Sequence, residues 1–395
     1  MSAHRIAGRD IVCVGFADWE TELWTNQHHL MHRLAADNEV LFVESLGLRR
    51  PTLAARDLSR LLRRLRTGLR PPRTLDGVHV LSPLLIPMHS STLVRSANTL
   101  LLRALVERAC TRLRFERPIL WAYVPQAEVL LQALKPSLVV YHCVDDIAAQ
   151  ERIDTASFRA AEERFARRAD LVLASARPLV DRLESIAENV LYAPNVADVQ
   201  LFATALQQGD ADPAMLSLPR PRILFVGAIV QSKLDFELIL SLARLRRDWS
   251  FALVGPVGPG DPSTDVSELA AAPNIHLLGH RPHHTLPQVM RAADAAIIPY
   301  ASNQLTASVF PMKVYEQLAA GLPVIATPLP SLQGLPDVAL GSDAQSICAA
   351  IERALASDSD ETRRGRSQRA AQHSWDARLA QIGEAIAAIE GGRER

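Results

Sequence analysis

Short apolar runs alternate with longer helical patterns along almost the whole chain. The runs are apolar at consecutive positions, which is typical of strands covered on both faces in a parallel sheet. Because helical stretches separate them, each half of the sequence predicts a doubly wound α/β unit. The expected strands are Ile11–Ala17, Glu39–Ser45, Val78–Ser82, Pro118–Val124, Leu138–Val144, Leu171–Ser175, Val190–Ala193, Arg222–Gly227, Ser250–Val254, Asn274–Leu278, Ala295–Pro299 and Val324–Ala326.

A polar, proline-rich stretch, Gln207–Pro221, is the best linker candidate between the two halves. A chain of 395 residues also exceeds what one core normally holds. We expect a domain over residues 1–206, a second over 207–375, and a helix over 376–395 that could pack back on the first. Two such domains facing each other would form a cleft at the linker. The expected helices include Leu23–Asp37, Thr92–Phe115, Phe158–Ala169, Lys233–Leu245, Thr285–Ala293 and Met312–Ala320.

Net charge is zero over the whole chain but unevenly spread. Between Arg49 and Arg117, fifteen arginines face four carboxylates, an excess that indicates an anionic partner. Within this region, Arg49–Arg73 carries leucines at helical spacing with arginines between them. That pattern fits a basic amphipathic helix on an anionic membrane surface, and equally an ordinary surface helix. Nucleic acid is a poorer partner, because no aromatic residues are interleaved and no reader motif is present.

The four cysteines are far apart and form neither a CxxC pair nor a Cys/His cluster with metal-ligand spacing. The first ten residues lack the apolar region of a signal peptide. No segment approaches the roughly 18 to 20 apolar residues that span a bilayer. We therefore expect a cytoplasmic protein, or one attached to the inner face of the plasma membrane from that side.

Lys313 is the most informative residue of the chain, since only three of its forty-three basic residues are lysines. It lies in the first turn of a helix expected to begin at Pro311–Met312, where a cation opposes the helix dipole. A bound anion would make that cation favourable. Glu316 lies three residues further along the same face, so ammonium and carboxylate can reach one ligand together. A ligand with phosphate and hydroxyl groups would use both, and a surface ion pair is the alternative.

Polar side chains also follow two expected strands of the first half. Asp145 and Asp146 come directly after a buried run, where sites of α/β proteins are built. One of them could be a general base, and Asp146 is the better candidate for a helix N-cap. Trp19 and His28 follow the first strand and could contact a sugar or phosphate, although core packing explains such residues as well.

Six segments in this order resemble the glycosyltransferases of the GT-B fold, close to the family-4-like bacterial enzymes that build surface polysaccharides. The resemblance covers most of the chain. The segments are VVYHCVDD (Val139–Asp146), APNVADVQLF (Ala193–Phe202), ILFVGAIVQSKLDFELILSLA (Ile223–Ala243), FALVGP (Phe251–Pro256), NIHLLGHRPHHTLPQVMRAADAAIIPY (Asn274–Tyr300) and FPMKVYEQLAAGLPVIATPLP (Phe310–Pro330).

The resemblance implies roles for matching positions in a C-terminal nucleotide-sugar domain. Glu316 matches the second acid of an E-x7-E signature, which hydrogen-bonds ribose hydroxyls in relatives. Lys313 matches a Pro-x-Lys position that contacts the donor diphosphate, and Met312 lies within that motif. Gly227 would let the backbone approach the phosphates. Lys233 would begin the next helix and reach the phosphates too, without the arginine partner of the usual pattern.

One position departs from that signature. Ser308 stands where the first acid is expected. The departure favours the subgroup that resembles xanthan-type glucuronosyltransferases and teichuronic-acid transferases.

The activity implied is transfer of a sugar from a UDP- or GDP-sugar to a hydroxyl of a glycan or lipid-linked glycan. Asp145 would be the base, with Trp19, His28 and Asp146 on the acceptor side of the N-terminal domain. No cofactor beyond the donor is implied, and no metal, because no DxD-like pair lies near the donor residues. The alternatives are a nucleotide-sugar epimerase or a sugar phosphorylase of the same fold, and a non-catalytic sugar-nucleotide-binding protein.

Overall fold

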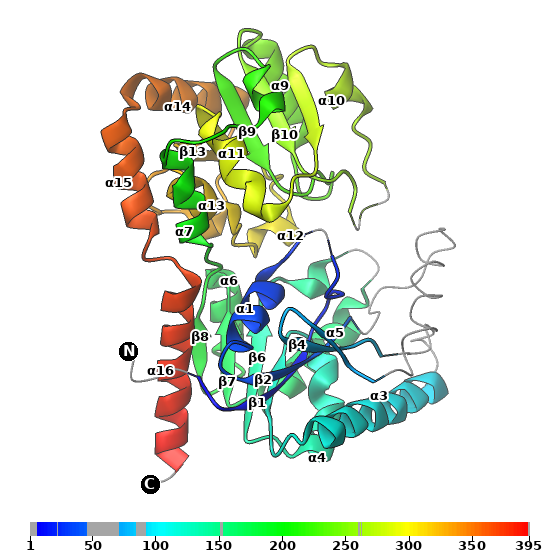
Figure 1. Ribbon diagram of the computed structural model, residues 1–395. Coiled ribbons are helices and arrows are strands. Elements are labelled where there is room, and N and C mark those ends of the chain that lie inside the picture. Colours follow the sequence, from blue (N-terminus) through cyan, green and yellow to red (C-terminus); the bar gives the residue numbers. More distant parts are fainter. Residues whose placement is uncertain are drawn as a thin grey trace. The chain divides into compact units, whose positions relative to one another are not determined.

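The computed structural model describes residues 6–21, 23–45, 71–83, 92–150, 153–259, 261 and 263–393, and it divides into two compact units (Figure 1). The N-terminal unit runs to Pro194 and takes in the chain again from Leu379. The C-terminal unit is one continuous stretch, Asn195–Arg378. Each unit has a hydrophobic core of its own, built on its own sheet.

The N-terminal sheet has the order β3-β4-β2-β1-β5-β6-β7-β8, and all pairs are parallel except β3 with β4. Strands β2, β4 and β3 lie on one side of β1, and strands β5 to β8 lie on the other side. The direction in which strands are added to the sheet therefore reverses between β1 and β5. Such a switch point is where doubly wound sheets bind ligands, at the carboxyl ends of the strands. The strands are β1 (Asp10–Val14), β2 (Glu39–Val43), β3 (Arg73–Leu75), β4 (Val78–Leu81), β5 (Ile119–Ala122), β6 (Leu138–Cys143), β7 (Leu171–Ala174) and β8 (Val190–Tyr192).

The helices of this unit connect the strands, and several begin at favourable capping residues. Asp154, for example, accepts the Ser157 backbone N–H and starts the helix that carries Glu162. The helices are α1 (Asn26–Leu34), α3 (Thr92–Leu113), η1 (Pro125–Leu130), α4 (Leu131–Leu134), η2 (Ile147–Ala149), α5 (Thr155–Ala166) and α6 (Arg177–Leu183). The last helix, α16 (Trp375–Arg393), enters the unit from Leu379, and its Glu390 pairs with Arg9 at 2.6 Å.

The C-terminal sheet is parallel throughout, with the order β11-β10-β9-β12-β13-β14. Its strand order reverses between β9 and β12, which defines the switch point of this unit. The central strands are completely buried, as their uninterrupted apolar runs require. The strands are β9 (Arg222–Val226), β10 (Ser250–Val254), β11 (Ile275–Gly279), β12 (Ala295–Ile298), β13 (Val324–Ala326) and β14 (Val338–Leu340).

The helices of the C-terminal unit pack in two groups, one with α9 against α10 and α14, the other with α13 against α7 and α15. The functional side chains below come mostly from the second group and from the strand ends. The helices are α7 (Val199–Ala203), η3 (Thr204–Leu206), α8 (Pro213–Leu216), α9 (Phe236–Leu245), α10 (Ser267–Ala271), η4 (His283–Thr285), α11 (Leu286–Arg291), α12 (Gln304–Ala307), α13 (Lys313–Ala319), η5 (Pro330–Leu332), α14 (Ala344–Ser357) and α15 (Asp360–Ala370).

All twelve expected strands are present, with ends that differ by up to three residues. The division between the units, at Pro194 and Asn195, comes earlier than the expected boundary at residues 206 and 207. The expected linker belongs to the C-terminal unit, because Arg291 holds its beginning. The guanidinium of that arginine donates to the carbonyl oxygens of Thr204 at 2.8 Å and Gln207 at 3.1 Å.

Most of the expected amphipathic helix, Arg49–Arg73, lies outside the described residues. Its described end, residues 71–73, is not helical, and Arg73 begins β3 and pairs with Glu20 at 3.0 Å. Within the described part of the chain, no helix combines the length and the apolar character that crossing a membrane requires.

Candidate functional site

Lys313, the first residue of α13, places its ammonium group at the switch point of the C-terminal sheet. Nζ donates a hydrogen bond to the Tyr300 hydroxyl at 2.7 Å. It also lies 5.0 Å from the centre of the Tyr300 ring and 5.6 Å from the centre of the Phe225 ring, both within range of a cation–π contact. Phe225 belongs to β9 and Tyr300 follows β12, the two strands that flank the switch point. The cation therefore lies where sheets of this type bind ligands.

Two glycines make room beside that cation. Gly227 follows β9 with φ +141°, and a Cβ there would lie 2.9 Å from Lys313 Cε. Gly255 follows β10 with φ +151°, and a Cβ there would come within 1.9 Å of the Gly227 carbonyl oxygen. Only glycine adopts such angles without strain and leaves this space empty. The structure thus brings together Gly227 and Lys313, which are far apart in the sequence.

Glu316 lies one turn after Lys313 and is the second notable charge of α13. Its side chain is only 12 % exposed, and it accepts no hydrogen bond from the described residues. Burial raises the pKa of this carboxyl to about 7; Lys313 lowers it in part, and the charge of Asp198 raises it further. Glu316 is therefore a carboxylate without a hydrogen-bond donor among the residues that the structure describes.

The neighbours of Glu316 come from two segments that the sequence motifs contain. His283 lies in the turn before α11, with Nε2 at 4.0 Å from Glu316 Oε1, and its ring meets the Phe202 ring edge to face at 5.3 Å. Asp198 caps α7 by accepting the Leu201 backbone N–H. His283 is not among the residues that the sequence singled out for this site. His283 belongs to the segment Asn274–Tyr300, whose resemblance to the glycosyltransferases was the signal that could have indicated its position beside Glu316.

Lys233 and Met312 are the remaining residues expected at this site. Lys233 does not begin a helix, because Asp235 caps α9 and the helix starts at Phe236. The residue lies in the preceding turn, where its carbonyl oxygen accepts the Ala301 N–H at 2.9 Å, beside Tyr300. Its ammonium group has no ion pair with any described residue. Met312 precedes Lys313 at the N-cap position of α13 and makes no side-chain cap.

Ser308, at the position of the missing acid, ends the short helix α12 and is buried. Asn303 and Thr306 cap that helix reciprocally, and Asn303 also donates to the Ser232 carbonyl oxygen at 3.0 Å. These bonds tie α12 to the turn that contains Lys233. The loop before α13 is therefore ordered by neutral polar side chains instead of a carboxylate.

Asp145 and Asp146 follow β6 in the N-terminal unit and differ in their surroundings. Asp146 is 7 % exposed, and both its oxygens accept hydrogen bonds from Arg159 Nη2, at 2.6 and 2.5 Å. Asp146 occupies the expected N-cap position of η2, but its side chain makes no cap hydrogen bond there. Asp145 is partly exposed at the carboxyl end of the strand. Of the pair, Asp145 is the more exposed.

The Asp146–Arg159 pair belongs to a buried network centred on Glu162, which is 2 % exposed. Glu162 accepts hydrogen bonds from Arg182 at 2.5 Å, the Tyr141 hydroxyl at 2.7 Å and Arg159 at 3.1 Å. Burial alone would raise the pKa of Glu162, but these partners outweigh burial and hold the pKa below its ordinary value. This carboxylate is fully compensated within the unit.

Trp19 and His28 are packing residues. The Trp19 ring is 1 % exposed and lies 5.0 Å from the Phe42 ring and 5.5 Å from the His28 ring, so it presents no face to a sugar. The Thr25 backbone N–H donates to His28 Nδ1 at 3.1 Å, so Nε2 carries the proton and donates to the Asp18 carbonyl oxygen at 3.0 Å. Burial lowers the pKa of His28 and keeps the ring neutral. Direct contact with an acceptor fits neither residue.

Both the C-terminal unit and the chain as a whole are similar to known proteins. Residues 220–357, which hold the Lys313 site, match the family model described as glycosyl transferases group 1. A protein of Bacillus subtilis (strain 168) named "Putative teichuronic acid biosynthesis glycosyltransferase TuaH" is 32% identical over 287 residues, which are 68% of this chain and 71% of that one. The chain belongs to the group 1 glycosyltransferases.

Solved structures show the fold of this glycosyltransferase. Sucrose-phosphate synthase from Thermosynechococcus elongatus has a TM-score of 0.67 at 17% identity, over 97% of this chain and 100% of that one. Anabaena HepE in complex with UDP-glucose has a TM-score of 0.65 at 16% identity, over 96% of this chain and 100% of that one. The trehalose-6-phosphate synthase OtsA has a TM-score of 0.68 at 12% identity, over 96% of this chain and 99% of that one. These structures confirm the expected GT-B fold. The family match and the Bacillus subtilis relative confirm the expected glycosyltransferase activity.

Two expectations about this glycosyltransferase stay predictions. Among the described residues, no group of three or more histidine, cysteine or acidic side chains lies together as a metal site would require. Metal independence is still a prediction from the sequence. The identity of the residues that bind donor and acceptor is likewise a matter for proposal.

Proposed function

We propose that this glycosyltransferase transfers a sugar from a nucleoside diphosphate sugar to a hydroxyl group of a glycan or lipid-linked glycan during polysaccharide synthesis. The name of the Bacillus subtilis relative, which refers to teichuronic acid biosynthesis, supports the acceptor class. Solved structures of the same fold are described as complexes with UDP, UDP-glucose and UDP-2-fluoro glucose. These favour UDP over GDP as the nucleotide.

The observation that carries the proposal is the pairing of Lys313 and Glu316 on one helix beside Gly227. The ammonium group would bind the diphosphate and stabilise the negative charge that develops as the sugar leaves. The glycine leaves room for phosphate oxygens against the backbone. Lys233, in the turn that follows, would supply a second cation, and Met312 would hold the start of α13 in place.

Glu316 would accept hydrogen bonds from the two ribose hydroxyls. The carboxylate lacks donors in the described part of the chain, and its pKa of about 7 reflects that lack. Donors from a bound ribose would stabilise the ionised form and complete the site. His283, close to Glu316 and in contact with Phe202, would then lie near the nucleoside.

Asp145 is the proposed general base for the acceptor hydroxyl. It is partly exposed at the carboxyl end of β6, whereas the neighbouring Asp146 is buried and accepts hydrogen bonds from Arg159. A carboxylate in hydrogen-bond reach of the hydroxyl would remove its proton as the new bond to the sugar forms. The N-terminal unit would thus provide the acceptor side.

Three ligands that differ in the number of phosphate groups test the donor site. Calorimetric titration with uridine, UMP and UDP separates the ribose contact from the diphosphate contact. Lys313→Met should weaken UDP binding by about 10- to 100-fold, the loss of a hydrogen bond to a charged group, and leave uridine binding unchanged. Glu316→Gln should weaken all three ligands. Arg247→Gln and Glu268→Gln, exposed residues of the same unit, are matched controls. Unchanged UDP affinity in both site variants would refute the assignment.

We also propose that Arg49–Arg73 brings the enzyme to the anionic inner face of the plasma membrane. The support is the local excess of positive charge together with the leucine stripe in the sequence. Each arginine near such a surface contributes about 1 kcal/mol, so attachment should be reversible and should weaken with salt. Sedimentation with anionic and neutral liposomes, at low and high salt, tests this. A protein that does not bind anionic liposomes at low salt would refute this proposal.

A further inference from the structure

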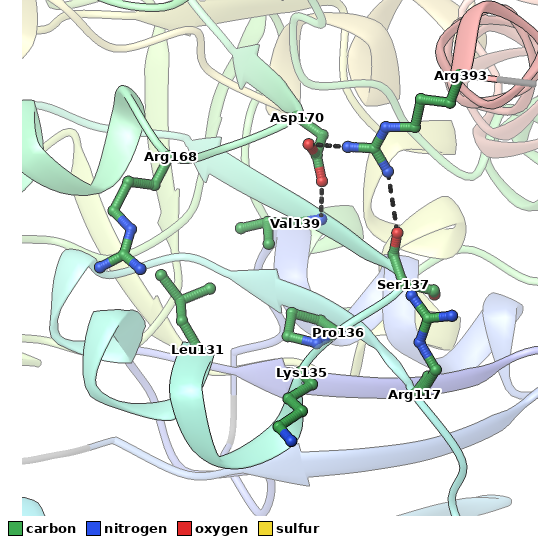
Figure 2. A pocket seen from close by; sticks show the side chains of 9 residues that line it. All are labelled: Arg117, Leu131, Lys135, Pro136, Ser137, Val139, Arg168, Asp170 and Arg393. Atoms are coloured by element: carbon green, nitrogen blue, oxygen red, sulfur yellow. Dashed lines mark hydrogen bonds and ion pairs between the residues drawn. The ribbon is translucent and has the colours of Figure 1, made fainter. Parts of the chain in front are cut away.

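A cavity of about 540 Å³ lies at the edge of the N-terminal sheet where β5, β6 and β7 begin (Figure 2). These strands are parallel neighbours, so the segments that lead into them meet at one edge. Asp145 lies at the opposite edge, beyond the carboxyl end of β6. The cavity is therefore separate from the proposed acceptor side of this unit.

Four cationic side chains line the cavity and come from four different segments (Figure 2). Arg117 precedes β5, and Lys135 ends α4 just before β6. Arg168 precedes β7, and α16 supplies Arg393. Among the described residues of the lining, Asp170 is the one carboxylate. We call this set the basic pocket.

Asp170 compensates one of the four cations. One of its oxygens accepts the Val139 N–H at 2.7 Å, and the other accepts a hydrogen bond from Arg393. Arg393 also donates to the Ser137 carbonyl oxygen at 3.0 Å (Figure 2). These bonds hold the end of α16 against the sheet. They leave Asp170 little capacity to neutralise the other cations.

The other three cations are poorly compensated. Arg168 lies 3.5 Å from Glu128, and that carboxylate is shared with Arg164 at the same distance. Arg117 and Lys135 are exposed and have no carboxylate partner within the described residues. Like charges that line one pocket repel one another, and a bound anion would replace part of this repulsion with attraction.

We propose that the basic pocket is a binding site for a phosphate-bearing anion, in the form of a diphosphate or a phosphate ester. Guanidinium groups match the geometry of phosphate oxygens, and a lysine adds a point charge. The volume suits a small ligand of this kind. A soluble diphosphate and the head group of an anionic lipid carry the same chemistry. This proposal does not rest on the assignment of Lys313 to the donor.

Pyrophosphate is the probe that tests the pocket. Calorimetric titration would use the full chain with Lys313→Met, so that the candidate donor site does not contribute. Adding Arg117→Gln and Lys135→Gln should weaken pyrophosphate binding by at least about tenfold for each cation removed. Both residues are exposed, so the fold should tolerate the changes.

The matched control carries Arg244→Gln and Arg247→Gln, two exposed arginines of the C-terminal unit that make no ion pair with a described residue. It removes the same charge and should bind pyrophosphate as before. The proposal is overturned if the Lys313→Met protein does not bind pyrophosphate, or if the pocket variant binds it as well as the control does.

A second arm identifies the source of the phosphate. Sedimentation with phosphatidylcholine vesicles that contain phosphatidic acid is compared with phosphatidylcholine alone. If the Arg117→Gln, Lys135→Gln protein loses vesicle binding relative to the control, the ligand is a lipid head group. If it loses pyrophosphate binding and keeps vesicle binding, the ligand is a soluble diphosphate. If neither loss occurs, the pocket is not an anion site.

Discussion

Glu162 in the N-terminal unit is a buried glutamate and Glu316 in the C-terminal unit is a largely buried one. Both lie on helices, but their charges are compensated differently. Glu162 receives hydrogen bonds from Arg159, Arg182 and Tyr141, and its pKa is held below the ordinary value. Glu316 receives none from the described residues, and burial raises its pKa to about 7. The described residues thus compensate the charge of Glu162 fully and leave Glu316 without a hydrogen-bond donor.

This difference distinguishes a charge that is buried to hold the fold together from a charge that is buried to bind a ligand. Desolvating a carboxylate costs free energy unless donors replace the lost water. The partners of Glu162 come from α5, α6 and β6, so its network joins elements of the unit. A ligand with hydroxyl groups would supply what Glu316 lacks, and titratable groups with such shifts are concentrated at functional sites.

The largest expected effect follows from breaking the complete network. Glu162→Ala removes the buried carboxylate that Arg182 and the Tyr141 hydroxyl share, and it leaves Arg159 with Asp146 alone. Loss of this buried partner should lower the free energy of unfolding by about 3–5 kcal/mol. Urea denaturation measures this. Glu163→Ala, next in the chain and exposed in its pair with Arg167, should cost less than about 1 kcal/mol. The comparison fails if Glu316→Ala is as destabilising as Glu162→Ala.

The next effect is the pH dependence of stability at Glu316. Because its folded pKa of about 7 exceeds the ordinary value of about 4.3, its contribution is fully present below that ordinary pKa and is lost as the pH rises to 7. Glu316→Gln should therefore gain stability relative to the unchanged protein across this window, by on the order of 3 kcal/mol.

Urea unfolding at several pH values across that window measures the gain. Glu162→Gln is the counterpart: the depressed pKa of Glu162 gives stability that is present above its ordinary pKa and lost as the pH falls. A stability difference for Glu316→Gln that does not change with pH would show that this carboxyl titrates normally.

The two adjacent aspartates extend the comparison to turnover. Asp145→Asn should reduce turnover by about 100-fold, the scale of lost general-base catalysis. Asp146→Asn weakens the pair with Arg159 and should act on stability instead. Steady-state kinetics and urea unfolding of both variants separate the effects. If turnover survives in Asp145→Asn and collapses in Asp146→Asn, the base is the other aspartate.

The smallest effect concerns the partner of Lys313. Tyr300→Phe keeps the ring and removes the hydroxyl that accepts from Nζ at 2.7 Å. The ammonium group would lose one restraint, and UDP affinity should fall by about 3- to 10-fold, as for one neutral hydrogen bond. Titration with uridine is the internal control, since it lacks phosphate. A loss of uridine binding as large as that of UDP would indicate a general disturbance of the sheet edge.

The sequence predicted what depends on local pattern. Consecutive apolar runs located the strands, and the neighbourhood of Gly227, Lys313 and Glu316 could be expected from motifs with defined order. Two strands were missed, β3 and β14, because they are short, lie at sheet edges and are not apolar throughout. Lys233 was placed in a helix because the capping role of Asp235 was not recognised.

Contacts between distant residues could not be predicted. Asp146 read as a helix cap, but its partner Arg159 comes from the next helix. The stretch at 207–221 read as a linker, because nothing local shows that Arg291 binds the carbonyl groups at its beginning. Likewise, the burial of His28 and the position of His283 beside Glu316 depend on packing that one sequence does not reveal.

The division of α16 between the units has a consequence for the order of synthesis. The C-terminal unit is continuous and can fold as soon as Arg378 has left the ribosome, but the N-terminal unit needs the segment from Leu379 onward. Arg9 precedes the whole C-terminal unit in the chain, and it meets its partner Glu390 only after that unit has been translated. Domains usually fold from the N-terminus during synthesis. In this chain the first unit to be started is the last to be completed.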